Sequence, residues 1–281
     1  MSRLPAIGIT CYPSAGGSGI VATELGLALA RSGYAVHFIT ASLPLRLKQY
    51  RENVFYHEVE VADYPVFQSP PYSLSLATAM ADTARRHGLD ILHVHYAIPH
   101  AASGFLAREM VGPDRLKLIT TLHGTDITLV GQEPSFFPLT RFVIERSDAV
   151  TAVSDFLARE TRRVFGVTRD LEVIPNFVDT RQYRPRDDES GRQAWAAPGE
   201  SLLVHASNFR EVKNLPAVID VFAGVAARLP ARLLLLGDGP EREPALARAA
   251  AAGVADRVHA PGLVADLTED LPLGDLLLLP S

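Results

Sequence analysis

Residues 118–126 read Leu-Ile-Thr-Thr-Leu-His-Gly-Thr-Asp, a strand pattern that stops abruptly in a polar loop. Leucine, isoleucine and β-branched threonine suit a buried, pleated strand, and Gly124 ends it where His123 and Asp126 stand. In an open parallel sheet, ligands bind outside the carboxyl ends of the strands. His123 is therefore a candidate site residue, and on this stretch alone a satisfied core histidine is an equally good interpretation.

A second loop of this kind stands near the N-terminus. Residues 16–19 read Gly-Gly-Ser-Gly, between an apolar strand pattern over 6–10 and a helical pattern over 20–32. Backbone amides at Gly16 and Gly17, together with the positive end of the helix dipole, would attract a phosphate or a carboxylate. The spacing is not Gly-x-Gly-x-x-Gly, so it does not indicate a dinucleotide cofactor. A plain tight turn is the alternative.

Strand and helix patterns alternate through the first part of the chain. Repeated βα units of this kind predict a parallel sheet with right-handed crossovers and helices on both faces. A proline-rich loop is expected over 64–71. The expected strands are 6–10, 35–40, 54–59, 91–95, 116–122, 149–153 and 171–174, and the expected helices are 20–32, 74–87, 99–110, 137–147 and 154–165.

The pattern lapses from 176 to 200, where polar and proline-containing sequence predicts a linker with a short helix over 193–197. A second α/β unit follows. We therefore expect an α/β protein with two Rossmann-like domains, 1–180 and 181–281, facing a cleft, the second of them incomplete. Its expected strands are 202–206, 232–236, 258–260 and a buried 276–279, and its expected helices are 215–228 and 241–252.

Composition narrows the class of protein. The 281 residues are 47% hydrophobic, enough for a large core, and the net charge of −5 without a basic run argues against a nucleic-acid partner. Cys11 is the only cysteine, and no long apolar leader precedes the first polar loop, so we expect a cytoplasmic protein. The four leucines at 276–279 fall far short of the ~20 residues of a membrane span. The oligomeric state is left open, a homo-oligomer included.

Two further polar loops follow strands of the second unit. Lys213 offers a mobile point charge for a phosphate, while Asn208 and the backbone around Gly237 offer neutral donors. With the two loops of the first unit they would suit a diphosphate leaving group. The alternative for Lys213 is a solvated lysine, although a positive charge near a helix N-terminus is mildly unfavourable.

Several motifs now resemble those of the retaining GT-B glycosyltransferases. They span most of the chain. The segment Ser-Asn-Phe-Arg-Glu-Val-Lys-Asn is the most diagnostic, because the broader superfamily usually has arginine where Asn208 stands, whereas the malate-transferring branch looks like this sequence. The motifs are Gly-Gly-Ser-Gly at 16–19, His-Val-His-Tyr-Ala-Ile-Pro at 93–99, Thr-Leu-His-Gly-Thr-Asp-Ile-Thr-Leu-Val-Gly at 121–131, Ser-Asp-Ala-Val-Thr-Ala-Val-Ser at 147–154, Ile-Pro-Asn-Phe-Val-Asp at 174–179 and the segment at 207–214.

The resemblance implies transfer of N-acetylglucosamine from UDP-N-acetylglucosamine to L-malate with retention, the first step of bacillithiol biosynthesis. It implies no metal and no other cofactor. On the donor side it implies Gly17, Asn208 and Lys213 around the diphosphate, His123 near the sugar and Leu263 near the uracil. From their loops we add Gly16 and Gly237 to the donor-binding residues, and we expect His123, Lys213 and Asn208 to form the catalytic set. On the acceptor side it implies Ser18, Tyr96, Arg141 and Asn176, and Arg141 is as readily a solvated helix residue.

The sequence departs from the family at its end. The family continues past Leu-Leu-Leu-Leu-Pro-Ser into a paired-glutamate motif, whereas this chain stops at Ser281. We therefore expect either a fragment of a longer product or an enzyme without full activity. Two alternatives follow: a related enzyme with a sugar or sugar-phosphate acceptor, for which Lys48 is the one nearby lysine, and a nucleotide-sugar-binding module without turnover.

Two other patterns have simpler interpretations. His93 and His95 alternate on a strand and share a face, but no third ligand has suitable spacing for a metal site. Cys11 follows a strand, and a small buried residue is a better interpretation than a nucleophile.

Overall fold

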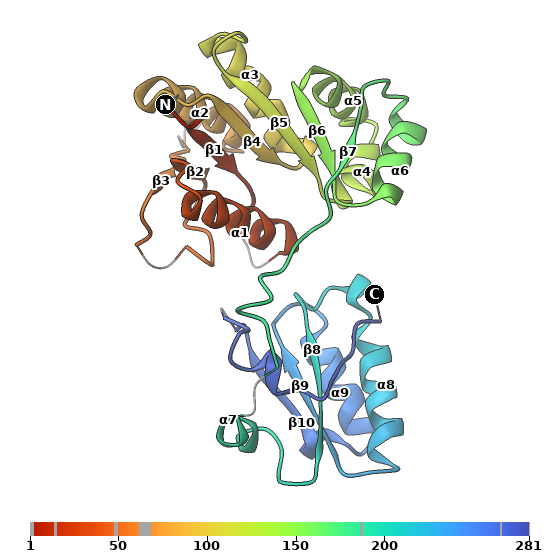
Figure 1. Cartoon of the computed structure of the whole chain (residues 1–281). Coiled ribbons are helices and arrows are strands. Elements are labelled where there is room, and N and C mark those ends of the chain that lie inside the picture. Colours follow the sequence, from red (N-terminus) through yellow and green to blue (C-terminus); the bar gives the residue numbers. More distant parts are fainter. Residues whose placement is uncertain are drawn as a thin grey trace. The chain divides into compact units, whose positions relative to one another are not determined.

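The computed structural model describes residues 3–13, 16–47, 50–61, 69–185, 188–264 and 266–280. Its contacts divide the chain into two compact units, Met1–Phe177 and Val178–Ser281. Each unit has its own parallel sheet covered by helices (Figure 1), which confirms the predicted α/β class. Lys48 and residues 64–68 of the predicted proline-rich loop lie outside the described residues.

The first unit contains a seven-stranded parallel sheet in the order β3-β2-β1-β4-β5-β6-β7. The predicted strands are confirmed to within one or two residues at each end. Because β1 pairs with both β2 and β4, the direction of winding reverses between β1 and β4. The strands are β1 (Ile7–Thr10), β2 (Val36–Thr40), β3 (Val54–Glu58), β4 (Ile91–His95), β5 (Lys117–Leu122), β6 (Ala149–Ala152) and β7 (Glu172–Val173).

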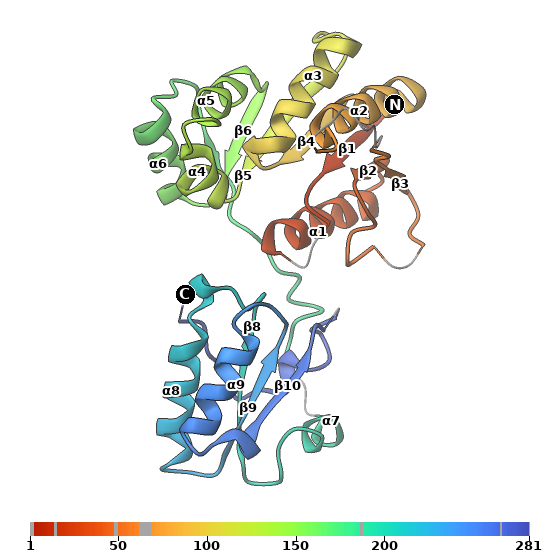
Figure 2. The same cartoon turned by 180° about the vertical axis from the view of Figure 1, so that it is seen from behind.

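Helices cover both faces of this sheet (Figures 1 and 2). One face packs against α1 through a core that includes Ala22, Leu27 and Phe38. The opposite face packs against the other long helices through a larger core that includes Met80 and Leu118. These helices are α1 (Gly17–Arg31), α2 (Tyr72–His87), α3 (Ala102–Val111), α5 (Phe137–Arg146) and α6 (Asp155–Phe165).

Local signals explain where these helices end. Ser154 caps α6, its Oγ accepting from the Leu157 amide at 3.2 Å. Gly88 and Gly166 follow α2 and α6 in the left-handed conformation, with φ of 62° and 59°.

Two predicted helix starts in the first unit were wrong. Helix α1 begins at Gly17 rather than at residue 20, so Gly17 to Gly19 form its first turn instead of a loop. The predicted helix over 99–110 begins as α3 at Ala102, because the separate turn η1 (Ala97–Ala101) contains the non-helical Ile98 and a cis Ile98–Pro99 bond. Two short helices, α4 (Thr125–Thr128) and η2 (Val130–Gln132), were not predicted.

The second unit contains a four-stranded parallel sheet in the order β10-β9-β8-β11. One face packs against α8 and α9, and the other against a cluster that includes Trp195, Ala196 and Leu273. The elements are α7 (Glu189–Gln193), β8 (Ser201–Ala206), η3 (Glu211–Lys213), α8 (Leu215–Ala226), β9 (Ala231–Leu236), α9 (Arg242–Ala251), η4 (Ala255–Arg257), β10 (Val258–Gly262), η5 (Leu271–Leu273) and β11 (Leu276–Leu277).

Two predictions for this unit were wrong. The short helix expected over 193–197 is α7, which starts earlier because Asp188 accepts a capping bond from the Gly191 amide at 3.0 Å. The leucines expected in a buried strand lie at the edge of the sheet, where Leu276 is 54% and Leu277 is 44% exposed. Among the described residues, no helix combines the length and the apolar character that crossing a membrane requires.

Candidate functional site

The carboxyl ends of β1, β4 and β5 bring together a group of rings in the first unit. The Tyr12 and Tyr96 rings meet edge to face with centroids 5.3 Å apart, and Tyr12 also lies 4.6 Å from the His100 ring. Tyr96 stacks on His123 at 5.6 Å, and its hydroxyl lies 2.9 Å from Thr125 Oγ1. Because the winding direction reverses between β1 and β4, this is the edge at which a ligand is expected.

A group of four histidines adjoins these tyrosines: His93, His95, His100 and His123. His95 Nδ1 lies 2.8 Å from His123 Nε2, and the His93 and His95 rings stack with centroids 4.7 Å apart. His93 Nε2 lies 2.7 Å from Thr121 Oγ1. His100 donates from Nδ1 to the His95 carbonyl at 2.6 Å, which leaves its Nε2 as an acceptor.

These imidazoles are held neutral. Burial lowers the pKa of His93, His100 and His123 to about 4 each, and burial with the neighbouring histidines lowers the pKa of His95 well below its usual value. The Nε2 atoms of His95 and His100 are buried without a hydrogen-bond partner among the described residues. Neutral His123 can therefore hydrogen-bond a sugar hydroxyl or carbonyl without bringing a charge.

The buried Asp126 positions the His123 loop. Its Oδ1 accepts from the amides of His123 at 3.1 Å and Gly124 at 2.8 Å, and its Oδ2 accepts from the Ala97 amide at 3.1 Å. Asp126 thus connects the end of β5 to the residues after β4 through backbone hydrogen bonds. Burial raises the pKa of its carboxyl group. Asp126 therefore positions His123. The sequence predicted that Asp126 lies in this loop but did not indicate its role.

The N-terminus of α1 belongs to the same unit and follows β1. The N-cap residue Gly16 has no side-chain cap, and the first turn contains no acidic residue. The Gly17, Ser18 and Gly19 amides belong to this first turn, where a helix leaves its N–H groups without intrahelical partners. With the helix dipole, the turn suits an anionic group, as predicted for Gly16 and Gly17.

At the carboxyl edge of the second sheet, two loops pack backbone against backbone. A Cβ atom on Gly237 would lie 1.9 Å from the Ser207 carbonyl oxygen, and one on Gly239 would lie 2.3 Å from that of Asn208. Both glycines also have positive φ, 135° and 154°. Only glycine permits this approach, which brings the predicted Asn208 and Gly237 together.

Asn208 and Lys213 stand on a loop with unusual backbone geometry. Phe209 and Asn214 have φ of 39° and 50°, and with Tyr96 at 91° they are three of the four described residues other than glycine with clearly positive φ. Such residues cluster at functional sites. The Asn208 Oδ1 is buried and has no hydrogen-bond partner among the described residues. The pKa of His205 is lowered mainly by burial, and Lys213 contributes to the lowering.

The N–H groups around Gly237 have partners within the second unit. The Gly237 amide donates to the Gly262 carbonyl at 2.9 Å, and the Gly239 amide donates to Asp238 Oδ1 at 2.8 Å. The structure thus shows the close approach that Gly237 permits, and its contact with a ligand stays a prediction. The hydrogen bond between Gly237 and Gly262 holds the end of β10 beside Gly237. Leu263 follows directly and is 58% exposed.

The predicted acceptor residues are only partly brought together. Tyr96 lies in the ring group, whereas no described contact joins Ser18, Arg141 or Asn176 to it. Arg141 is exposed on α5 and has no described ion pair, and Asn176 is exposed after β7. Cys11 is fully buried and burial raises its pKa to about 12, so it is a core residue rather than a nucleophile.

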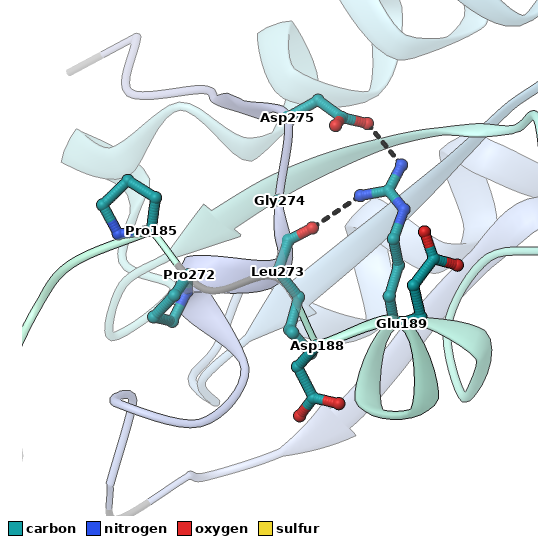
Figure 3. Close-up of a pocket in the computed structure, with 8 residues that line it drawn as sticks. Pro185, Asp188, Glu189, Pro272, Leu273, Gly274 and Asp275 are labelled. Atoms are coloured by element: carbon teal, nitrogen blue, oxygen red, sulfur yellow. Dashed lines mark hydrogen bonds and ion pairs between the residues drawn. The ribbon is translucent and has the colours of Figure 1, made fainter.

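A pocket of about 430 Å³ in the second unit has neither Asn208, Lys213 nor Gly237 in its lining (Figure 3). It is lined by Asp188, Arg192 and Asp275, and Arg192 donates to Asp275 Oδ2 and to the Leu273 carbonyl, each at 2.6 Å. The Asp275 amide bonds to Leu202, near the start of β8. The pocket is therefore at the amino edge of the sheet, and its arginine is occupied by structural bonds.

Comparison with known proteins identifies relatives along the whole chain. A family model described as Glycosyltransferase Family 4 matches residues 15–182, and one described as Glycosyl transferases group 1 matches residues 200–281. The N-acetyl-alpha-D-glucosaminyl L-malate synthase of Bacillus anthracis is 49% identical over 276 residues, 98% of this chain and 72% of that protein. A GDP-mannose-dependent alpha-(1-6)-phosphatidylinositol monomannoside mannosyltransferase of Mycobacterium tuberculosis (strain ATCC 25618 / H37Rv) is 27% identical, covering 69% of this chain and 51% of that protein.

Solved structures share the fold. Anabaena Alr3699/HepE in complex with UDP and glucose superposes with a TM-score of 0.76 at 18% identity, covering 99% of this chain and 74% of that one. Sucrose-phosphate synthase from Thermosynechococcus elongatus superposes with a TM-score of 0.74 at 17% identity, covering 99% and 76%. These structural similarities support the predicted GT-B fold, which is built from Rossmann-like units.

Proposed function

The chain belongs to glycosyltransferase family 4, and we propose that it transfers N-acetylglucosamine from UDP-N-acetylglucosamine to L-malate with retention at the anomeric carbon. The observation that carries the proposal is the 49% identity to the Bacillus anthracis synthase across 98% of this chain. Weaker similarity to mannosyltransferases, at 27% identity, does not favour another acceptor. Family matches in both units likewise do not favour a binding module without turnover.

On the donor side, the second unit offers groups suited to a diphosphate. Lys213 supplies a charge with no described counter-ion, and the buried Asn208 Oδ1 has no hydrogen-bond partner in the part of the chain that the structure describes. Leaving-group departure breaks the bond between the anomeric carbon and the phosphate oxygen, and negative charge grows on that oxygen. A lysine near this oxygen stabilises the transition state more than the ground state, which is the condition for catalysis.

On the acceptor side, the first unit offers the Tyr96 hydroxyl, while the amides in the first turn of α1 are kept for the donor diphosphate. The malate hydroxyl oxygen forms the new bond to the anomeric carbon, and its proton leaves with the departing phosphate. The neutral His123 imidazole suits a contact with the donor sugar. The proposed step uses no metal ion, because Lys213 and backbone amides meet the developing charge.

The acceptor prediction is tested with malate and lactate, which share the 2-hydroxy acid and differ in the second carboxylate. We expect kcat/KM for malate to exceed that for lactate by at least about 100-fold, because an unmatched charge in the site is costly. Arg141→Ala should raise the KM for malate and reduce this preference, while leaving UDP affinity unchanged. Steady-state kinetics with calorimetry of UDP binding measure both quantities.

Arg146→Ala, which removes another exposed arginine from α5, is the matched control and should keep the preference. Equal turnover of malate and lactate by the wild type would refute the acceptor assignment. A strong malate preference that survives Arg141→Ala would instead leave the function standing and remove Arg141 from the site.

A further inference from the structure

Three histidines converge at the outer part of the first sheet, on elements that the transfer reaction does not use. His37 is on β2, His57 on β3, and His87 is the last residue of α2. One nitrogen of each can be chosen so that all three lie within 4.8 Å of one another. They are the group among the described residues whose spacing suits a metal ion.

The topology explains this convergence. His37 pairs in register with Phe55, and His57 pairs with Ile39, so both histidines point to the same face of the sheet. Ile39 belongs to the core under α2, which identifies that face. Helix α2 runs across it and ends at His87, whose ring lies 4.7 Å from His37 and 5.0 Å from His57.

The geometry is close to that of a metal-bound set. His37 Nδ1 lies 2.9 Å from His57 Nε2. In a tetrahedral zinc site with Zn–N bonds of about 2.0 to 2.1 Å, two ligand nitrogens lie about 3.3 Å apart. The two rings therefore need to separate by only about 0.4 Å, and the exposed His87 can complete a third position by a side-chain rotation.

The surroundings support one rigid and two adjustable ligands. His37 is only 4% exposed, and Phe55 stacks on its ring at 4.6 Å, which fixes its orientation. His57 is half-buried and His87 is exposed, so solvent can supply a fourth ligand. The positive charge of Arg86 is close enough to disfavour a cation here. The pKa of His57 is lowered by burial first, then by His87 and then by Arg86.

We propose that His37, His57 and His87 form a binding site for one divalent zinc ion that links β2, β3 and the end of α2. Three imidazole ligands with an open fourth position suit Zn²⁺ over Mg²⁺ or Ca²⁺, which prefer oxygen ligands. The ion would hold the edge strand β3 to α2. The site is separate from the ring group at the carboxyl ends of β1, β4 and β5, and it takes no part in sugar transfer.

The test is calorimetric titration of chelator-treated protein with zinc chloride. We expect one site in the wild type, and at least a tenfold loss of affinity in both His87→Ala and His57→Ala, because even the outer partners of metal ligands contribute about 10- to 100-fold. Zinc should raise the Tm of the wild type and not that of His87→Ala. His87 is exposed at a helix end, so its replacement should not impair folding.

His259→Ala, which removes a histidine of the second unit, is the matched control and should titrate as the wild type does. Three outcomes overturn the proposal: no zinc binding by the wild type, unchanged binding by His87→Ala and His57→Ala, or equal weakening by His259→Ala. Unchanged binding by the first two variants would point to the His93, His95, His100 and His123 group instead. Cobalt absorbance adds a readout that does not depend on enzyme activity.

Discussion

Lys213→Ala should lower kcat/KM for transfer by roughly 30- to 1000-fold, equivalent to about 2 to 4 kcal/mol of transition-state stabilisation. The reason is the charge that grows on the departing diphosphate, which a lysine on the loop after β8 is suited to meet. The loop is pre-shaped, since Asn214 adopts φ of 50° and η3 ends at Lys213. Steady-state kinetics with the donor varied at saturating malate measure the loss.

Arg228→Ala is the control for this change. Arg228 is exposed and follows the opposite end of α8, so the variant also removes one positive charge but leaves the loop before α8 intact. Its kcat/KM should stay within about twofold of the wild type. A Lys213→Ala enzyme that retained activity within a few-fold would show that Lys213 does not stabilise the leaving group.

Gly17→Val should abolish detectable binding of UDP-N-acetylglucosamine while leaving the Tm nearly unchanged. Among the described residues, no atom beyond the chain neighbours and the backbone of α1 lies within 4 Å of a Cβ placed at Gly17, so the new side chain would meet open space there. That open space lies at the N-terminus of α1, where an anionic group is expected. Calorimetric titration with the donor and thermal unfolding measure the two effects.

Gly224→Val is a matched control for the substitution. Gly224 also lies in a helix, α8, and a Cβ there likewise meets nothing within 4 Å. Its donor affinity should equal that of the wild type. Unchanged donor affinity in Gly17→Val would mean that the first turn of α1 does not hold the diphosphate, and a large fall in Tm would mean that the loss reflects folding.

The order of strands and helices could be predicted from the sequence because local residue patterns determine it. The left-handed glycines at 88 and 166 and the cap at Ser154 are signals within a few residues of the helix ends. The start of α1 was misplaced because glycine is a poor helix former, yet it is tolerated in a first turn whose amides have no intrahelical partners. Leu276 and Leu277 have a core-like composition, and only the strand order reveals that they lie at an edge.

The site was less predictable because its contacts join distant residues. The contact between His95 and His123 depends on the register of β4 against β5, and the one between Tyr12 and Tyr96 depends on β1 lying beside β4. The three histidines of the proposed zinc site come from separate elements, 20 and 30 residues apart, and no spacing motif predicts their convergence. Asn208 and Lys213 were predicted from a motif, and their roles stay predictions.

The neutral histidines behind Tyr12 and Tyr96 also couple the folding of the first unit to proton concentration. In the folded chain the pKa of His93, His100 and His123 is about 4 and that of His95 is well below its usual value, whereas an unfolded histidine titrates near 6.5. The unfolded chain therefore binds more protons as the pH falls below about 6.5, and each extra proton lowers the free energy of unfolding by about 1.4 kcal/mol per pH unit. The free energy of unfolding of the first unit should therefore fall at a pH above the range in which ordinary carboxylates titrate. The acid sensitivity comes from the histidines at the carboxyl ends of β4 and β5.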